Sequence, residues 1–249
     1  MIIDAHVHIN KTEKIDRHFS LSAFHSLMVA SKVSKAIVMP NVSSEIPASD
    51  LNAQLLSSFR TLPPSQVYNF YPFLLISPWE LNTIPQQIDN FTISGLKAHP
   101  SISRLAIDDD MWLPYFKIAE KHCFPIIVHC GRDPLSHVSH LITAAYNNPK
   151  TTFIAAHLGG NASDLVEEAI NLAKEAHLDN LYFDTSAVKL PSLIGKAIQQ
   201  LGSERIIFGS DEPYSDLRVS LYIMDLLHLH KVEKENVMKR NILRLLFNE

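Results

Sequence analysis

Short segments rich in Val, Ile and Phe alternate with segments of helical character along the chain, and this alternation limits the fold more than any other feature. Strands are expected at Ile2–His8, Lys35–Met39, Val67–Ile76, Ile93–Ala98, Pro125–His129, Thr152–His157, Leu181–Asp184 and Arg205–Gly209. Helices are expected at Phe19–Ser31, Ser49–Arg60, Asp110–His122, Leu135–Asn147, Ser163–His177, Ser192–Gln200, Tyr214–His228 and Lys234–Phe247. Strands that alternate with helices favour a parallel sheet, because a parallel crossover needs a long connection.

The length of the chain selects one parallel architecture. At about 30 residues for each strand and its helix, 249 residues accommodate eight units and little else. We therefore predict one α/β domain over residues 1–249, a (β/α)8 barrel, with a doubly wound open sheet as the alternative. Barrels of this type build their active sites at the carboxyl ends of the strands.

The composition is that of an ordinary globular protein, with 46% hydrophobic and 19% charged residues. The net charge of −4 argues against a nucleic-acid partner, which usually requires a basic surface. No apolar run approaches the roughly 18 residues of a membrane span, and the N-terminus lacks the pattern of a signal peptide. Two cysteines are too few for a disulfide framework, so a reducing, cytoplasmic location is expected.

Thirteen histidines are more than packing requires, and two of them lie in the first expected strand, in the segment Asp4-Ala-His6-Val-His8. Side chains alternate along a strand, so His6 and His8 are expected on the same face. Two imidazoles at this spacing, near the end of a strand, can bind one metal ion. Taken alone, the pair also fits ordinary surface or hydrogen-bonded histidines.

Three further residues with metal-binding side chains end later strands. His129 follows Pro-Ile-Ile-Val, His157 follows Phe-Ile-Ala-Ala, and Asp211 follows Ile-Ile-Phe-Gly-Ser. Because the carboxyl ends of barrel strands converge, four imidazoles and one carboxylate are expected at the same rim. This donor set predicts a site for zinc or a similar first-row ion.

At these residues the sequence resembles the amidohydrolase superfamily of metal-dependent barrels. The matching segments are Ile-Asp-Ala-His6-Val-His8-Ile, Gly95-Leu-Lys97-Ala-His99-Pro, Ile-Ile-Val-His129-Cys-Gly, Ile-Ala-Ala-His157-Leu-Gly-Gly, Tyr-Phe-Asp184-Thr-Ser and Ile-Ile-Phe-Gly-Ser-Asp211. They occur in order over nearly the whole chain. Within the superfamily, the chain looks most like the amidohydrolase-related branch that includes aminocarboxymuconate semialdehyde decarboxylase. Together these motifs are specific for the superfamily and carry little information about the substrate.

The resemblance implies one divalent metal, with zinc expected, held by His6, His8, His129 and Asp211 and completed by water. A bound metal lowers the pKa of water towards about 7 and polarises a carbonyl group. Asp211 and His157 are then the expected catalytic residues. Asp211 would accept a proton as water attacks, and His157 would contact the water or the substrate and stabilise the developing oxyanion.

Lys97 leaves the number of metals open. It ends the fourth strand, where some members of the superfamily carry a carboxylated lysine or a glutamate that bridges two metals. In that case His129 and His157 would bind the second ion. In the reading that we favour, Lys97 remains an ammonium and binds a substrate carboxylate. His99 and Arg132 are further candidates for substrate binding, the latter because a guanidinium matches a carboxylate bidentately, although Arg132 also fits a solvated loop.

The predicted function is hydrolysis of a small carbonyl, amide, ester or lactone substrate. The main alternative is decarboxylation of a small unsaturated or aromatic acid; the decarboxylases of this branch are generally longer chains, which favours hydrolysis here. A TatD-like metal nuclease is less favoured because that type carries Glu where Lys97 stands. A non-catalytic barrel is also less favoured, because structural zinc sites are closed and rich in Cys. We expect a small-molecule partner that carries a carboxylate, no nucleic acid and no membrane, and leave a homodimer open.

Overall fold

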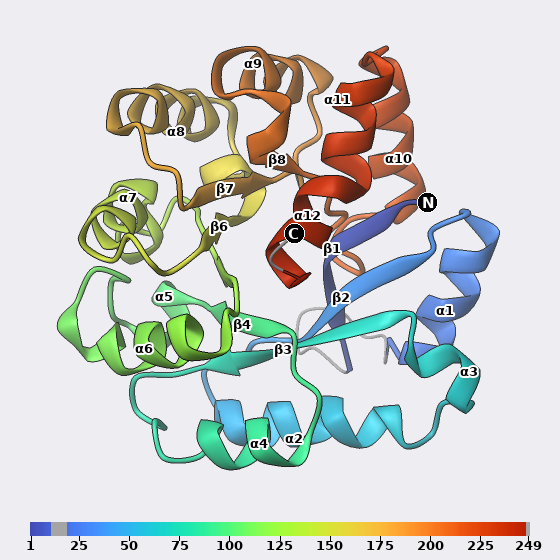
Figure 1. The fold of residues 1–249 in the computed structure, drawn as a ribbon, viewed down its shortest axis with the longest axis vertical. Coiled ribbons are helices and arrows are strands. Elements are labelled where there is room, and N and C mark those ends of the chain that lie inside the picture. Colours follow the sequence, from blue (N-terminus) through green and yellow to red (C-terminus); the bar gives the residue numbers. More distant parts are fainter. Residues whose placement is uncertain (11–18, 248–249) are drawn as a thin grey trace.

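The computed structural model describes residues 1–10 and 19–247. In these ranges the chain forms eight strands: β1 (Ile3–Ile9), β2 (Lys35–Pro40), β3 (Phe70–Ile76), β4 (Gly95–Ala98), β5 (Ile126–Val128), β6 (Phe153–Ala155), β7 (Leu181–Asp184) and β8 (Ile206–Ile207). Neighbouring strands pair in parallel and in the order of the sequence, which confirms the predicted (β/α)8 barrel. Figure 1 shows the strands in the middle of the molecule, with most of the helices outside them.

The barrel closes between β8 and β1 through a few contacts rather than a continuous ladder. β8 contributes only two residues to the sheet. Beyond it, Asp211 N–H donates to the carbonyl of His6 at 2.9 Å, and His8 N–H donates to the carbonyl of Glu212 at 2.8 Å. Val7 and Glu212 form an isolated parallel bridge at the same place. The closing contacts therefore lie among residues that were predicted to bind a metal.

The helices of the described residues are α1 (Leu21–Ala30), α2 (Ala48–Phe59), α3 (Pro64–Val67), α4 (Ile84–Asn90), α5 (Pro100–Ser103), α6 (Leu113–His122), α7 (Val138–Asn147), α8 (Ser163–Ala176), α9 (Pro191–Leu201), α10 (Leu217–Leu226), α11 (Lys231–Glu235) and α12 (Asn241–Phe247). Short 3-10 turns precede α6 and α7, and a π-helical segment over Asn236–Arg240 joins α11 to α12. The longest helix described, α8, has 14 residues, and no described helix has both the length and the apolar character needed to cross a membrane.

Alternate residues of a strand face two different cores. Ile126 and Val128 of β5 pack in the layer between strands and helices. Ile127, between them, belongs to the cluster inside the barrel, which also contains Ile242 and Leu245 of α12. α12 thus fills one end of the barrel, and Figure 1 shows it at the centre of the ring of strands. The other end, where the strands finish, carries buried polar side chains instead.

Two predicted strands differ from the observed ones for local reasons. β3 begins at Phe70 rather than Val67, because Pro64 starts the short helix α3 and proline is favoured in the first turn of a helix. β6 ends at Ala155 rather than His157, whose backbone turns into the left-handed region with φ 61°. The bounds of the other strands differ from the prediction by at most two residues.

Differences among the helices have similar origins. The helix predicted over Tyr214–His228 begins at Leu217, where the Asp216 carboxylate caps it by accepting from Arg218 N–H at 2.8 Å. The last helix, predicted from Lys234, begins at Lys231 and passes through the π-helical segment. Helices α3, α4 and α5 were not predicted, because segments of 4, 7 and 4 residues are too short to show an amphipathic period.

Candidate active site

Three of the predicted metal ligands converge at the closing contacts of the barrel. His6 Nε2 lies 3.2 Å from His8 Nε2 and 3.5 Å from Asp211 Oδ1. His8 Nε2 lies 3.7 Å from the same carboxylate oxygen. All three side chains are buried, and their ligand atoms form a group that could hold a metal ion.

The hydrogen bonds of Nδ1 in His6 and His8 show which nitrogen of each ring is available to a metal. His6 Nδ1 lies 2.8 Å from Asp184 Oδ2, and His8 Nδ1 lies 2.9 Å from the carbonyl oxygen of Pro40. Because both oxygens accept, the hydrogen of each neutral ring is on Nδ1 and the lone pair is on Nε2. Burial is the main cause that lowers the pKa of His8, and the nearby Lys97 ammonium acts in the same direction, which keeps the His8 ring neutral.

The spacing of these atoms fits a divalent metal. Two ligand atoms bound about 2.1 Å from a tetrahedral ion are about 3.4 Å apart. The observed separations are 3.2, 3.5 and 3.7 Å. Imidazole nitrogen and carboxylate oxygen are the donors of many catalytic zinc sites, which use three protein ligands and leave a position open. His6, His8 and Asp211 therefore suit one first-row divalent ion.

A second group of candidate ligands, His6, His157 and Asp184, already surrounds a hydroxyl group. Ser186 Oγ lies 3.1 Å from His6 Nδ1 and 2.8 Å from His157 Nδ1, and it donates to Asp184 Oδ1. The same carboxylate oxygen accepts from the backbone N–H groups of His157 and Ser186, each at 3.0 Å. Burial opposes ionisation of Asp184, but the hydrogen bonds that it accepts from His6 and Ser186 lower its pKa. We interpret this group as a hydrogen-bond network that orients two histidines.

His129 and His157 form a pair beside the three converging ligands. His157 Nε2 lies 3.2 Å from His129 Nδ1, while His157 Nδ1 faces the carbonyl oxygen of Ser186 at 3.2 Å. Burial is the main cause that lowers the pKa of both rings, so both are neutral. The structure thus places His129 against His157 rather than in the group of His6, His8 and Asp211, and its role as a metal ligand stays a prediction.

Lys97, at the end of β4, lies inside the site. It is buried, and its Nζ lies 3.3 Å from His6 Nε2, the atom that carries the lone pair. Burial lowers the pKa of Lys97 to about 8, while Asp184 and Asp211 act in the opposite direction. In this arrangement the ammonium and a metal compete for the same nitrogen of His6. Carboxylation of Lys97 to bridge two metals stays a prediction.

The backbone around the site is specialised for close approach. A Cβ atom at Gly209 would lie 2.9 Å from His6 Cβ, so only glycine lets the end of β8 pack against β1 here. Asp211 and His157 have φ values of 70° and 61°, in the left-handed region. Such backbone costs on the order of 1–3 kcal/mol at a non-glycine residue and persists where the surrounding structure requires it. In both residues it accompanies a side chain at the site.

A cleft of about 850 Å³ opens above these residues at the carboxyl ends of the strands. Six of the residues predicted for the site line it: His8, Lys97, His99, His129, His157 and Asp211. The ring of His99 stacks on that of His129, with centroids 3.9 Å apart and planes inclined by 11°. The structure therefore brings His99 to the wall of the cleft, where its binding of substrate stays a prediction.

Arg132 is not among the described residues that line this cleft. Its guanidinium donates to both carboxylate oxygens of Asp164, at 3.0 and 3.2 Å, and both side chains are largely exposed. Asp164 lies in the first turn of α8, far along the chain from Arg132, so the motif around His129 gave no sign of this pairing. Substrate binding by Arg132 therefore has no support from its position.

Two residues of the site were not predicted. Ser186 follows β7 in the segment Asp184-Thr-Ser, and its position just after a strand end was the available signal. Tyr214 lines the cleft three residues after Asp211, with its ring edge-on to His8 at a centroid distance of 5.4 Å. Neither side chain is an ordinary metal ligand, so a search for ligand types passes over both.

With the barrel and its candidate metal ligands described, comparison with known proteins defines the class. A profile of the amidohydrolase family matches residues 3–247. The chain belongs to this family of amidohydrolases. A search of curated proteins finds no match.

Several solved structures share the fold over almost their whole length. An amidohydrolase from Burkholderia multivorans with bound zinc has a TM-score of 0.77 at 14% identity, with 98% of each chain covered. 2,6-Dihydroxybenzoate decarboxylase from Rhizobium has a TM-score of 0.75 at 14% identity, again with 98% of each chain covered. 4-Oxalomesaconate hydratase from Rhodopseudomonas palustris has a TM-score of 0.72 at 16% identity, with 99% of this chain and 95% of the hydratase covered. At these identities the similarity shows the fold.

Proposed function

We propose that the protein is a metal-dependent hydrolase of small carbonyl, amide, ester or lactone substrates that carry a carboxylate. The observation that carries this proposal is the position of Asp211. Its carboxylate lies beside both His6 Nε2 and His8 Nε2, and it also lines the open cleft. Attack by a water molecule requires a base that lies between the candidate metal ligands and the substrate cleft.

When bound, a divalent metal would activate a water molecule and polarise the substrate carbonyl. His6, His8 and Asp211 are the residues that would hold it, and Asp211 would take the proton that the attacking water loses. His157 carries its hydrogen on Nδ1, towards Ser186, so its Nε2 is an acceptor. His157 can therefore receive a proton from Asp211, and it can stabilise an oxyanion as a donor only after that transfer.

Lys97 supports a substrate with a carboxylate. Burying an ammonium is unfavourable unless an anion compensates its charge. Lys97 Nζ lies 3.3 Å from the neutral Nε2 of His6, and the lysine also lines the cleft. With His6 Nε2 engaged as a metal ligand, the Lys97 ammonium would be available to bind a substrate carboxylate in the cleft.

Decarboxylation is a second candidate, favoured by Lys97 and by the fold neighbours. A carboxylate held at Lys97 next to the metal group is also the reacting group of a decarboxylase, in which the carbon–carbon bond breaks and the carbon then takes a proton. The shortness of the chain no longer argues against this reaction, because the chain covers 98% of the Rhizobium 2,6-dihydroxybenzoate decarboxylase. Hydrolysis keeps the first place because Asp211 is poised to receive a proton.

The two reactions differ in their products. Zinc-loaded protein would be incubated in ¹⁸O-labelled water with esters, lactones and amides of small carboxylic acids, and with hydroxybenzoates. Hydrolysis would place the label in the product acid, whereas decarboxylation would release carbon dioxide and leave no label in the organic product. Asp211→Asn serves as the control for contaminating activity. Carbon dioxide release alone would replace the first candidate by the second, and no turnover of any compound would overturn both.

A further inference from the structure

A second hollow of about 620 Å³ adjoins the main cleft at the same rim of the barrel. Its walls come from the loops after β2, β3 and β4, and therefore lie at the carboxyl ends of these strands. The two hollows share four lining residues: Ser43, Ser44, His99 and Ile102. His99 stands between them, since its ring also stacks on His129 in the main cleft. The two hollows are therefore neighbouring compartments of one rim.

Trp79 gives the second hollow an aromatic wall. It belongs to the loop after β3, and 61% of its surface is exposed. Its indole N–H donates to the carbonyl oxygen of Ser103 at 3.0 Å, which fixes the ring against α5. Trp112, the other tryptophan of the chain, is fully buried. An exposed indole held in a hollow beside a catalytic cleft is suited to stack on a planar group.

The charge of the second hollow differs from that of the main cleft. Its described lining residues include Glu45 and Glu80 but neither lysine nor arginine. The Glu80 carboxylate is held by the backbone N–H groups of Ala48 and Ser49 at 2.8 and 3.0 Å, at the start of α2. The main cleft is lined by Lys97 and Lys189 and by two of the candidate metal ligands, His8 and Asp211. A carboxylate is therefore favoured in the main cleft and disfavoured in the second hollow, where the indole of Trp79 suits an uncharged planar group.

We propose that the second hollow is a subsite for the distal, uncharged, planar part of the substrate, stacked on Trp79, while the substrate carboxylate lies at Lys97. This inference rests on the proposed function for the position of the carboxylate. It specifies the substrate class as carboxylic acids extended by an aromatic group, larger than a single-ring benzoate.

The test compares two probes that differ by one ring. Dissociation constants of benzoate and biphenyl-4-carboxylate would be measured by calorimetry at pH 7 on the zinc-loaded protein, on Trp79→Ala and on Trp79→Phe. Burying one ring against an aromatic side chain predicts roughly tenfold tighter binding of the biphenyl acid by the wild type. Trp79→Ala should remove this advantage and leave benzoate unchanged, whereas Trp79→Phe should keep most of it. Tyr146→Ala, an exposed aromatic residue of α7, is the matched control.

The outcomes separate this inference from the proposed function. An advantage of the biphenyl acid that disappears in Trp79→Ala supports the subsite even if no hydrolysis is found. Equal affinities of the two acids, or an advantage that survives in Trp79→Ala, would overturn the subsite and leave the reaction untouched. Loss of benzoate binding in Trp79→Ala would show that Trp79 supports the fold of the rim and would also overturn it, as would failure of both acids to bind the wild type.

Discussion

The Nε2 atoms of His6 and His8 lie 3.2 Å apart, while Asp184 and the carbonyl of Pro40 hold the hydrogens of these rings on Nδ1. Two lone pairs that face each other at this distance repel, so the arrangement is favourable when a cation lies between them. The hydrogen bonds on the far side of each ring thus prepare the pair for a metal.

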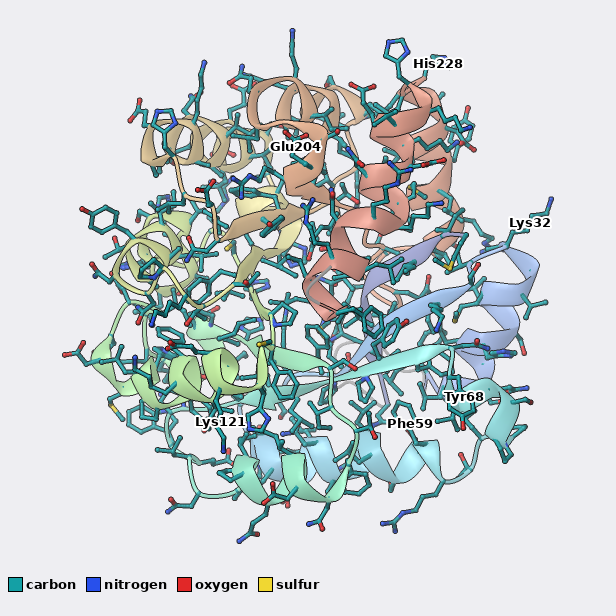
Figure 2. The ribbon with its side chains drawn as sticks, viewed as in Figure 1. Lys32, Phe59, Tyr68, Lys121, Glu204 and His228 are labelled. Atoms are coloured by element: carbon teal, nitrogen blue, oxygen red, sulfur yellow. The ribbon has the colours of Figure 1, made fainter. Side chains whose placement is uncertain are left out.

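Removing either histidine should reduce metal content without unfolding the barrel. His6→Ala and His8→Ala each delete one of three converging ligands, so we expect the metal recovered per chain, by elemental analysis, to fall at least tenfold. Circular dichroism should remain that of the wild type. His228→Ala is the control, because Figure 2 shows His228 projecting from the periphery of the molecule. Full metal content in both variants would refute the proposed site.

The hydroxyl of Ser186 should matter for metal affinity although it is not a ligand. It contacts the Nδ1 atoms of both His6 and His157 and donates to Asp184. Ser186→Ala is expected to weaken metal binding about tenfold, measured by competition with a chelator. Ser58→Ala, which removes a hydroxyl bonded only within α2, should have no effect. An unchanged affinity in Ser186→Ala would mean that Asp184 orients the rings alone.

Asp211→Asn should separate metal binding from turnover. The amide oxygen can still face the metal group, but an amide cannot accept the proton of the attacking water. We expect kcat to fall by at least about 100-fold while His6 and His8 retain most of the metal. The measurement is kcat together with metal content in the same preparation. Wild-type turnover by metal-loaded Asp211→Asn would exclude this carboxylate as the base.

Binding of a carboxylate should weaken as the pH rises, because the ammonium of Lys97 is needed for it. Burial lowers the pKa of Lys97 to about 8, and a bound cation would lower it further. Lys97 is an ammonium at pH values well below this pKa and loses its charge as the pH rises through it. The affinity for benzoate should therefore fall by up to about tenfold for each pH unit above the pKa. Lys97→Met should bind benzoate weakly at every pH. Lys121→Met, at an exposed lysine labelled in Figure 2, should retain the wild-type profile.

A side chain at Gly209 should disturb the site through the backbone. The Cβ of Gly209→Ala would lie 2.9 Å from His6 Cβ and 3.4 Å from Ser186 Cβ, so β8 and β1 must move apart. Overpacking of this kind costs about 1–3 kcal/mol of the free energy of unfolding, which urea denaturation would measure. Gly195→Ala, where the nearest atom lies 3.6 Å away, should not destabilise the protein in the same way. Equal stability of Gly209→Ala and the wild type would contradict the close packing.

The architecture was predictable because strand and helix segments differ in local composition and repeat regularly. The same regularity placed His129, His157 and Asp211 at strand ends, and hence at one rim. The predicted start of a strand was wrong where a single residue sets it, as Pro64 does before β3.

The details of the site depend on distances between segments that lie far apart in the sequence. The pattern of histidines does not reveal that His129 faces His157, or that the Ser186 hydroxyl lies between two rings. It also does not reveal the pairing of Arg132 with Asp164. The local sequence is the same whether the arginine side chain points into the cleft or towards Asp164.

The barrel is joined between its first and last strands by only a few backbone contacts, and the candidate ligands come from both sides of that junction. A bound ion would therefore act as a reversible cross-link between the two ends of the chain, and would offset part of the entropy lost when they are brought together. Amide hydrogens of β1 and of the segment around Asp211 should then be the ones whose protection depends most on the metal. The side chains that would hold the ion thus belong to the same residues whose backbones close the barrel.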